Sequence, residues 1–270
     1  MAIKCTVLIL SYFFHRLTIP MVESLYKSSG FVKPNYKGEF IPCSMGIIFV
    51  FNILLISMPL LRLESESNYL SIMVFVLGIL SMGFIGLTDD FIGNNDVKGF
   101  KGHIKMLINL RLTTGGLKAV FGGIVSVLIA LIVSEGLIDF VVNILLIALF
   151  TNFINLLDLR PGRAMKGFLI IGISIIFFVN NLFRTIILSF IGAVLALLPY
   201  DIKGRSMLGD IGANSLGIIL GIGATALPIK IKIIVTIFLI IANLYSEKRS
   251  ISSLISENKL LSFLDELGRG

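Results

Sequence analysis

Charged residues and cysteines are both scarce in this sequence. Of its 270 residues, 14% are charged and 56% are hydrophobic, whereas about a quarter of a soluble domain is charged. This composition excludes an ordinary soluble domain. The two cysteines, Cys5 and Cys43, form neither a disulfide framework nor a metal-binding pattern, so we interpret both as small apolar residues that only pack against their neighbours.

Long runs with almost no charge recur down the chain, each close to the length that a bilayer demands. We expect about nine transmembrane helices, at 3–22, 41–61, 69–88, 116–134, 137–155, 167–181, 184–200, 213–228 and 230–245. The N-terminal run lacks a small-residue cleavage site, so we interpret it as a retained first span. Neither a repeat nor a linker divides the chain. The sequence therefore predicts one all-α polytopic membrane domain over residues 1–270.

The basic residues are distributed unequally between the two sets of loops. One set carries Lys27, Lys33, Lys37, Lys98, Lys101, Lys105, Arg111, Arg160, Arg163, Lys166, Lys203, Arg205, Lys248 and Arg249. The other set carries Arg62, Arg184, Lys230 and Lys232, with the acids Glu64, Glu66, Glu135 and Asp139. Because cytoplasmic loops are enriched in Lys and Arg, the first set is predicted to be cytoplasmic. The N-terminus is then outside and the C-terminus inside.

Two adjacent acids, Asp89 and Asp90, end the third predicted span at its cytoplasmic side. The dipole of a helix is negative at its C-terminus, and each carboxylate raises the pKa of the other. A cation should therefore compensate them, either a metal ion or the following Lys98, Lys101 and Lys105. The alternative is that both are ordinary solvated loop acids.

Asn152, Asn155 and Asp158 recur every three residues at the cytoplasmic end of the fifth span. On a helix this spacing places them within a stripe of about 120°, and polar groups in a span are costly unless they find partners. A shared partner is one interpretation. The alternatives are hydrogen bonding between helices for the asparagines and a local ion pair of Asp158 with Arg160 and Arg163.

Asp210 lies in "MLGDIGANSLG", where the eighth span begins from the cytoplasmic side. A helix cap is the plain interpretation of an aspartate there. The flanking Gly209 and Gly212 also allow a ligand to approach the backbone, and a helix N-terminus favours phosphate. Since Mg²⁺ is usually bound by one or two carboxylates plus substrate phosphates, these loops together predict a cytoplasmic pocket for a nucleotide diphosphate.

Three segments in this order, "DDFIG", "NFINLLD" and "GDIGANSLG", resemble the polyprenyl-phosphate N-acetylhexosamine-1-phosphate transferases, the superfamily of the MraY- and WecA-type enzymes. "IPCSMG", at 41–46, looks like an early Thr-Pro-containing motif of that family. The resemblance covers roughly residues 37 to 220. It implies Mg²⁺-dependent transfer of a sugar-1-phosphate from a UDP-linked amino sugar to undecaprenyl phosphate, with release of UMP, at the cytoplasmic face of a bacterial plasma membrane.

The resemblance also implies residue roles. Asp89, Asp90 and Asp158 are the expected catalytic residues, and Asp210 with Asp89 the expected Mg²⁺ ligands. The expected substrate-binding residues are Lys37, Lys101, Asn152, Asn155, Arg160 and Arg163. The lipid bilayer is a further expected partner, a nucleic acid is not, and a homodimer is left open.

The sequence departs from the family pattern in three places. Pro161 stands where a second aspartate is usual. Only His15 and His103 are present, and neither lies in the loop after the ninth span where the family has a His-rich motif. Residues 251–267 are too polar for a tenth span and predict an amphipathic interfacial helix. Two alternatives therefore stay open: a non-catalytic membrane paralogue, and a transporter, which would instead place its acids at the midplane.

Overall fold

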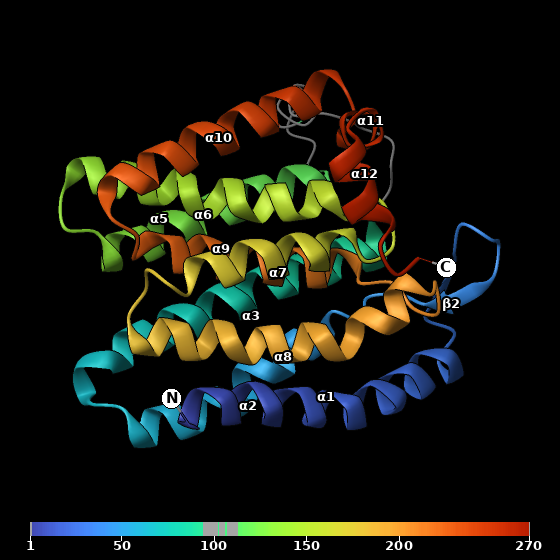
Figure 1. Ribbon diagram of the computed structural model, residues 1–270, viewed down its shortest axis with the longest axis horizontal. Helices are drawn as coiled ribbons and strands as arrows, with labels where there is room; N and C mark the ends of the chain where they lie inside the picture. The colour runs from blue at the N-terminus through green and yellow to red at the C-terminus, as the bar shows by residue number, and fades with distance from the viewer. Residues whose placement is uncertain (1, 94–101, 103–105, 107–112, 270) are drawn as a thin grey trace.

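The computed structural model describes residues 2–93, 102, 106 and 113–269, and it is a bundle of roughly antiparallel helices (Figure 1). The long helices are α1 (Ala2–Ser28), α2 (Ile47–Leu63), α3 (Tyr69–Ile92), α5 (Thr114–Val133), α6 (Leu137–Leu157), α7 (Arg163–Ile175), α8 (Asn181–Ile202), α9 (Gly209–Thr225) and α10 (Ile229–Lys248). Two short helices close the chain, α11 (Ile251–Glu257) and α12 (Lys259–Glu266).

Helix α9 is the centre of the bundle. Every residue from Ile211 to Thr225 is buried, and α9 packs most extensively on α6 and α3. Glycine makes the approach to α6 close, because a Cβ on Gly217 would lie 2.5 Å from the Cα of Thr151, and one on Gly221 would lie 2.7 Å from the Cα of Ile147. The backbones are thus nearer than larger side chains would allow.

Six helices are long and apolar enough to cross a membrane, within the described part of the chain. They are Cys5–Ser28, Glu66–Ile92, Thr114–Val133, Leu137–Leu157, Asn181–Ile202 and Ile229–Lys248. Helix α2 is apolar but has 17 residues, and α7 has 13, which is about 20 Å of helix. All nine expected ranges overlap a helix, and the expectation of a helical membrane protein agrees with this architecture.

Several boundaries differ from the expectation, two of them most clearly. Residues 41–42 are not helical but belong to β2 (Phe40–Pro42), which pairs antiparallel with β1 (Val32–Pro34). Helix α7 covers 163–175 rather than 167–181. Residues 180 and 181 belong to the start of α8, where Asn180 is the cap and accepts a hydrogen bond from the N–H of Phe183.

A buried polar network joins α1, α2 and α8. The Asn52 side chain accepts a hydrogen bond from Ser11 at 2.6 Å and donates one to Ser189 at 3.0 Å, and His15 lies 3.1 Å from its oxygen. These groups are satisfied by one another, which is the usual condition for polar side chains inside a helical membrane bundle.

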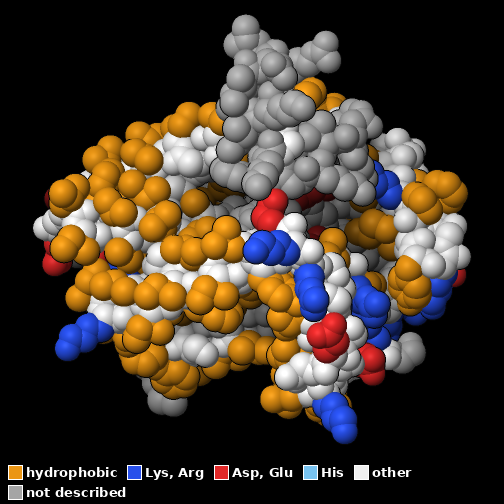
Figure 2. Space-filling view, turned by 90° about the horizontal axis from the view of Figure 1, so that it is seen from above, with side chains coloured by type: hydrophobic (Ala, Val, Ile, Leu, Met, Phe, Trp, Pro, Cys, Tyr) orange, Lys and Arg blue, Asp and Glu red, His pale blue; other side chains and the backbone are white. Residues whose placement is uncertain are grey.

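Basic side chains gather toward one end of the bundle. In Figure 2 hydrophobic side chains dominate the left half of the view, and most of the Lys and Arg side chains lie toward the right, the side that carries the C-terminus in Figure 1. We call this the carboxylate end: α3, α6 and α8 finish there and α9 begins there.

Candidate functional site

The chain segment before α2 and the segment before α9 pair at the carboxylate end. The N–H of Met45 donates to the carbonyl of Met207 at 3.0 Å, that of Gly46 donates to Leu208 at 2.9 Å, and that of Met207 donates to Pro42 at 2.8 Å. The "IPCSMG" and "MLGDIGANSLG" segments, far apart in the sequence, are therefore neighbours.

Asp90 connects the end of α3 to this pair. Its carboxylate accepts hydrogen bonds from the N–H of Asp210 at 2.9 Å, from the N–H of Ile211 at 3.2 Å and from the hydroxyl of Ser44 at 2.7 Å. Asp90 thus supplies from another helix the acceptor that an N-cap residue normally provides. Leu208, at the N-cap position itself, makes no side-chain cap, so the plain interpretation of Asp210 as a cap does not hold.

Asp89 and Asp210 converge on Lys118, the only charged residue of α5. The ammonium of Lys118 donates to Oδ1 of Asp210 in a short contact and lies 3.9 Å from Oδ2 of Asp89. All three side chains are less than one-third exposed. Two carboxylates from different helices therefore share one cation.

This arrangement answers the electrostatic problem of acids at a helix C-terminus. The negative end of α3 meets the positive end of α9, so the carboxylate of Asp90 gains hydrogen bonds there. Lys118 supplies the positive charge beside Asp89. The lysines expected to do this, Lys98, Lys101 and Lys105, lie outside the described residues.

Glycines make the close approach possible. A Cβ on Gly86 of α3 would lie 2.5 Å from the carbonyl oxygen of Asp210. Gly209 has φ of +75° and a Cβ there would lie 2.7 Å from the carboxylate of Asp90. Any side chain at these two positions would separate α3 from α9 or strain the backbone.

Asp158 follows the end of α6 and lies near the same cluster. Burial raises its pKa well above the ordinary value, and the charges of Asp201, Asp210 and Asp90 raise it further. Within the described residues its carboxylate accepts no hydrogen bond. A buried carboxylate without a hydrogen-bond donor is stabilised strongly when a ligand brings a cation or a donor to it.

Asp201, near the end of α8, holds the loop that follows Asp158. Its carboxylate accepts hydrogen bonds from the N–H of Gly162 at 2.5 Å and from the N–H of Leu208 at 3.0 Å. Gly162 takes a left-handed conformation with φ of +74°. One buried side chain therefore ties the loop between α6 and α7 to the residues that precede α9.

The other expected substrate-binding residues have different surroundings. Asn152 donates to Asn243 of α10 at 2.5 Å, which is the contact between helices that its alternative interpretation described. Asn155 is half-buried and Arg160 is exposed. Lys37 lies exposed in the turn between β1 and β2, whereas Lys33 donates to the backbone carbonyl of Asp90 at 2.7 Å.

Arg163 was expected to bind substrate, but in the structure it is buried against the C-terminal helices. Its guanidinium makes two hydrogen bonds of 2.8 Å to the carboxylate of Asp265 and one of 2.8 Å to the hydroxyl of Ser252. The planar fork of arginine matches a carboxylate, so its donors are largely engaged by the protein itself.

The carboxylates of Asp89 and Asp210 are the residues that would hold a divalent cation. Oxygen donors suit Mg²⁺, which commonly takes only one or two protein carboxylates and completes its shell with water and phosphate. Within the described residues, no group of three or more His, Cys, Asp or Glu side chains is arranged to hold a metal. The donor set fits an Mg²⁺ that a phosphate ligand helps to bind, and not a site closed by protein alone.

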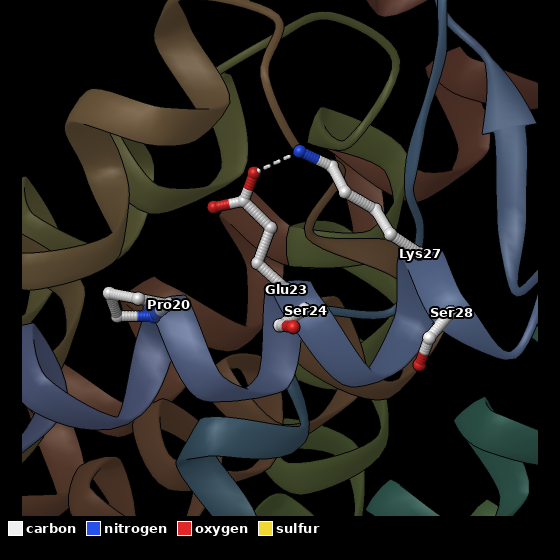
Figure 3. A pocket seen from close by; sticks show the side chains of 5 residues that line it. All are labelled: Pro20, Glu23, Ser24, Lys27 and Ser28. Atoms are coloured by element: carbon white, nitrogen blue, oxygen red, sulfur yellow. Dashed lines mark hydrogen bonds and ion pairs between the residues drawn. The ribbon is translucent and has the colours of Figure 1, made fainter.

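Two cavities share no residue with this cluster. A depression of about 510 Å³ follows one face of α1 and is lined by Pro20, Glu23, Ser24, Lys27 and Ser28, with an ion pair from Lys27 to Glu23 (Figure 3). A larger cavity of about 1230 Å³ lies at the opposite end of the bundle, beside the ion pair of Lys232 and Asp139.

Sequence reasoning missed Lys118 and Asp201. Lys118 had a readable signal, since a single ionisable residue in an apolar helix commonly has a specific partner. Asp201 lies in the last turn of α8, just before the basic residues of the following loop, and had none. Compared with known protein families and with curated proteins, the chain matches no family model and no curated protein.

Proposed function

We propose that the chain is a membrane-embedded transferase of the polyprenyl-phosphate type. It transfers an N-acetylhexosamine-1-phosphate from a UDP-linked amino sugar to undecaprenyl phosphate and releases UMP. The observation that supports this best is the convergence of Asp89, Asp90 and Asp210 with Lys118 at one end of the bundle. Phosphoryl transfer needs positioning and charge neutralisation more than covalent chemistry, and such a cluster supplies both.

The reaction exchanges one phosphoanhydride partner for another. An oxygen of the lipid phosphate attacks the phosphorus next to the sugar, a new P–O bond forms, and the bond from that phosphorus to the oxygen of UMP breaks. The lipid phosphate is already an anion at neutral pH, so little base catalysis is required. In-line approach of two anions requires that nearby cations offset their repulsion.

The residues have separate tasks in this proposal. Asp89 and Asp210 would hold Mg²⁺, which would neutralise charge on the diphosphate. Asp90 is a positioning residue, because its carboxylate fixes the start of α9 and the backbone of Asp210. Lys118 holds the two metal-binding carboxylates together and can turn to the phosphates. Asp158 lies near the cluster, and its carboxylate accepts no hydrogen bond from the described residues, so it is free to act on the bound substrate.

The proposed setting is a bacterial plasma membrane crossed about nine times, with the carboxylate end in the cytoplasm. The basic residues at that end favour this orientation. Soluble UDP-sugar then reaches the cluster from the cytoplasm and the lipid phosphate from the bilayer. Purified protein, undecaprenyl phosphate and a panel of radiolabelled UDP-sugars test the proposal. We expect Mg²⁺-dependent lipid-linked product, and no product with any sugar contradicts it.

A second candidate is a non-catalytic paralogue that keeps the fold. Lys118 already forms ion pairs with Asp89 and Asp210, and Arg163 is engaged by Asp265. In this alternative the ion pairs are structural and Mg²⁺ has no effect on the protein. Binding of Mg²⁺ and of UDP to the purified protein separates the two candidates, since only the transferase requires both.

A further inference from the structure

The C-terminal helices dock on the loop that carries Asp158. Arg269, just after α12, donates from Nε to the backbone carbonyl of Pro161 at 2.7 Å and from Nη1 and Nη2 to the carboxylate of Asp265. Asp265 in turn receives the bidentate pair from Arg163 at the start of α7. The two arginines and one aspartate therefore join the tail to both ends of the segment 161–163.

A second set of contacts fixes the end of α12. The ammonium of Lys166 donates to the backbone carbonyls of Leu264 at 3.1 Å and Asp265 at 2.7 Å. These are among the last carbonyls of α12, which have no partner within the helix. A cation there also complements the negative end of the helix dipole.

The buried contacts of α12 are mainly charged. Asp265 is 8% exposed, whereas Leu260 and Phe263 are 67% and 63% exposed and Leu264 is half-buried. The arginine that receives Asp265 is 5% exposed. Removal of the tail would leave the Arg163 guanidinium without its carboxylate partner. Because burial of an unpaired charge is costly, the loop would then favour a position in which Arg163 reaches water.

The loop is held on its other side by Asp201. That carboxylate accepts from the N–H of Gly162, while Arg269 binds the carbonyl of the residue before it. The segment between α6 and α7 is thus fixed from the interior by α8 and from outside by the tail. Asp158 is the first residue of this segment, directly after the end of α6.

We propose that α11 and α12 form a latch that positions the Asp158 loop for phosphotransfer, with Asp265 and Arg269 as positioning residues. This rests on the proposed function in one respect, that Asp158 acts on the bound diphosphate. Whether these contacts order the loop does not depend on the reaction that the protein catalyses. It extends the site to a part of the chain that lies about a hundred residues away in sequence.

Replacement of Asp265 by asparagine tests the latch, because it keeps the shape and removes the charge. We expect amide hydrogen exchange in residues 158–163 to accelerate by about 10-fold or more in lipid nanodiscs. Turnover with UDP-sugar should fall by about 10-fold while KM for undecaprenyl phosphate is unchanged. Glu257→Gln, an exposed substitution in α11, is the matched control and should change neither quantity.

If Asp265→Asn folds poorly, a protease cleavage site inserted between Arg249 and Ser250 provides a second test of the latch. The folded protein is cut, washed in high salt to remove 250–270, and then given the free peptide. Exchange in 158–163 should accelerate on removal and slow again with added peptide. Unchanged exchange in both the variant and the cut protein overturns the latch. If the wild-type protein makes no lipid-linked product, the proposed function fails, and the exchange measurements still decide the latch.

Discussion

Replacement of Lys118 by methionine removes the cation shared by Asp89 and Asp210 while keeping a side chain of similar length. At an effective dielectric constant of about 20, unit charges about 4 Å apart attract by about 4 kcal/mol, and desolvation of the lysine offsets part of this. We therefore expect Lys118→Met to lower the free energy of unfolding by about 2–3 kcal/mol. For a chain of this size the apparent Tm should fall by about 5–10 °C.

Mg²⁺ distinguishes a cation site from a structural ion pair. Without Lys118, two like charges remain, and Mg²⁺ at about 100 times its Kd stabilises a folded state by about 2.7 kcal/mol. Added Mg²⁺ should therefore restore most of the lost Tm. Lys232→Met is the matched control, because Lys232 pairs with Asp139 at 2.5 Å at the opposite end of the bundle. That variant should also be destabilised, but Mg²⁺ should not restore its Tm.

Thermal unfolding in detergent, with and without Mg²⁺, measures both effects. The exposed pair of Lys27 and Glu23 provides a baseline, since such pairs contribute about 0–1 kcal/mol. If Lys118→Met lowered Tm no more than Lys27→Met, the ion pair would not contribute to the fold. If Mg²⁺ raised the Tm of both buried-lysine variants equally, the carboxylates of Asp89 and Asp210 would not form a cation site.

Three further predictions concern orientation, packing and pH. A reporter fused after Arg249 should be cytoplasmic and one inserted near Glu66 external; a cytoplasmic Glu66 reporter would contradict the shared-face argument. Gly86→Ala should destabilise the protein by about 1–3 kcal/mol and reduce transfer, because the added Cβ would meet the backbone of α9. Gly123→Ala is the control and should be harmless, because open space surrounds that position. Equal effects of the two substitutions on stability would refute the packing argument. Burial alone would raise the pKa of Asp265, but hydrogen bonds from Arg163 and Arg269 hold it well below its ordinary value. Its stabilising contribution is therefore complete above the unfolded pKa of about 3.9 and is lost as pH falls through the folded pKa. Proteolysis of the tail at graded pH should show protection at about pH 5 and release only in stronger acid; release at neutral pH would contradict the pair.

Helix positions were predictable from the sequence because long uncharged runs record them directly. Helix α6, for example, was expected at 137–155 and covers 137–157. The segment 41–46 was assigned to a span because it is apolar, but its carbonyls and N–H groups pair with β1 and with residues 207–208. Pairing over such a separation leaves no local signal in the sequence.

The candidate site was only partly predictable. Asp89, Asp90 and Asp210 were identified from rare acids at helix ends, and the structure brings them together. Lys118 was missed because the expected cations were the lysines of the loop that follows Asp90 directly in the sequence. Arg163 was assigned to substrate because it is basic and lies beside Asp158, whereas its partner, Asp265, is about a hundred residues away. Charge alone does not reveal which opposite charge a side chain meets in the fold.

The transfer activity of Asp210→Asn tests the central claim most directly. The substitution keeps size and removes one charge aimed at Mg²⁺ and the diphosphate. In detergent micelles with undecaprenyl phosphate and the UDP-sugar that the wild-type protein uses, we expect turnover to fall by about 10²–10³ or more, with folded yield little changed. Near wild-type turnover, with the same Mg²⁺ dependence, would contradict the account, because Asp210 would then serve only to pair with Lys118.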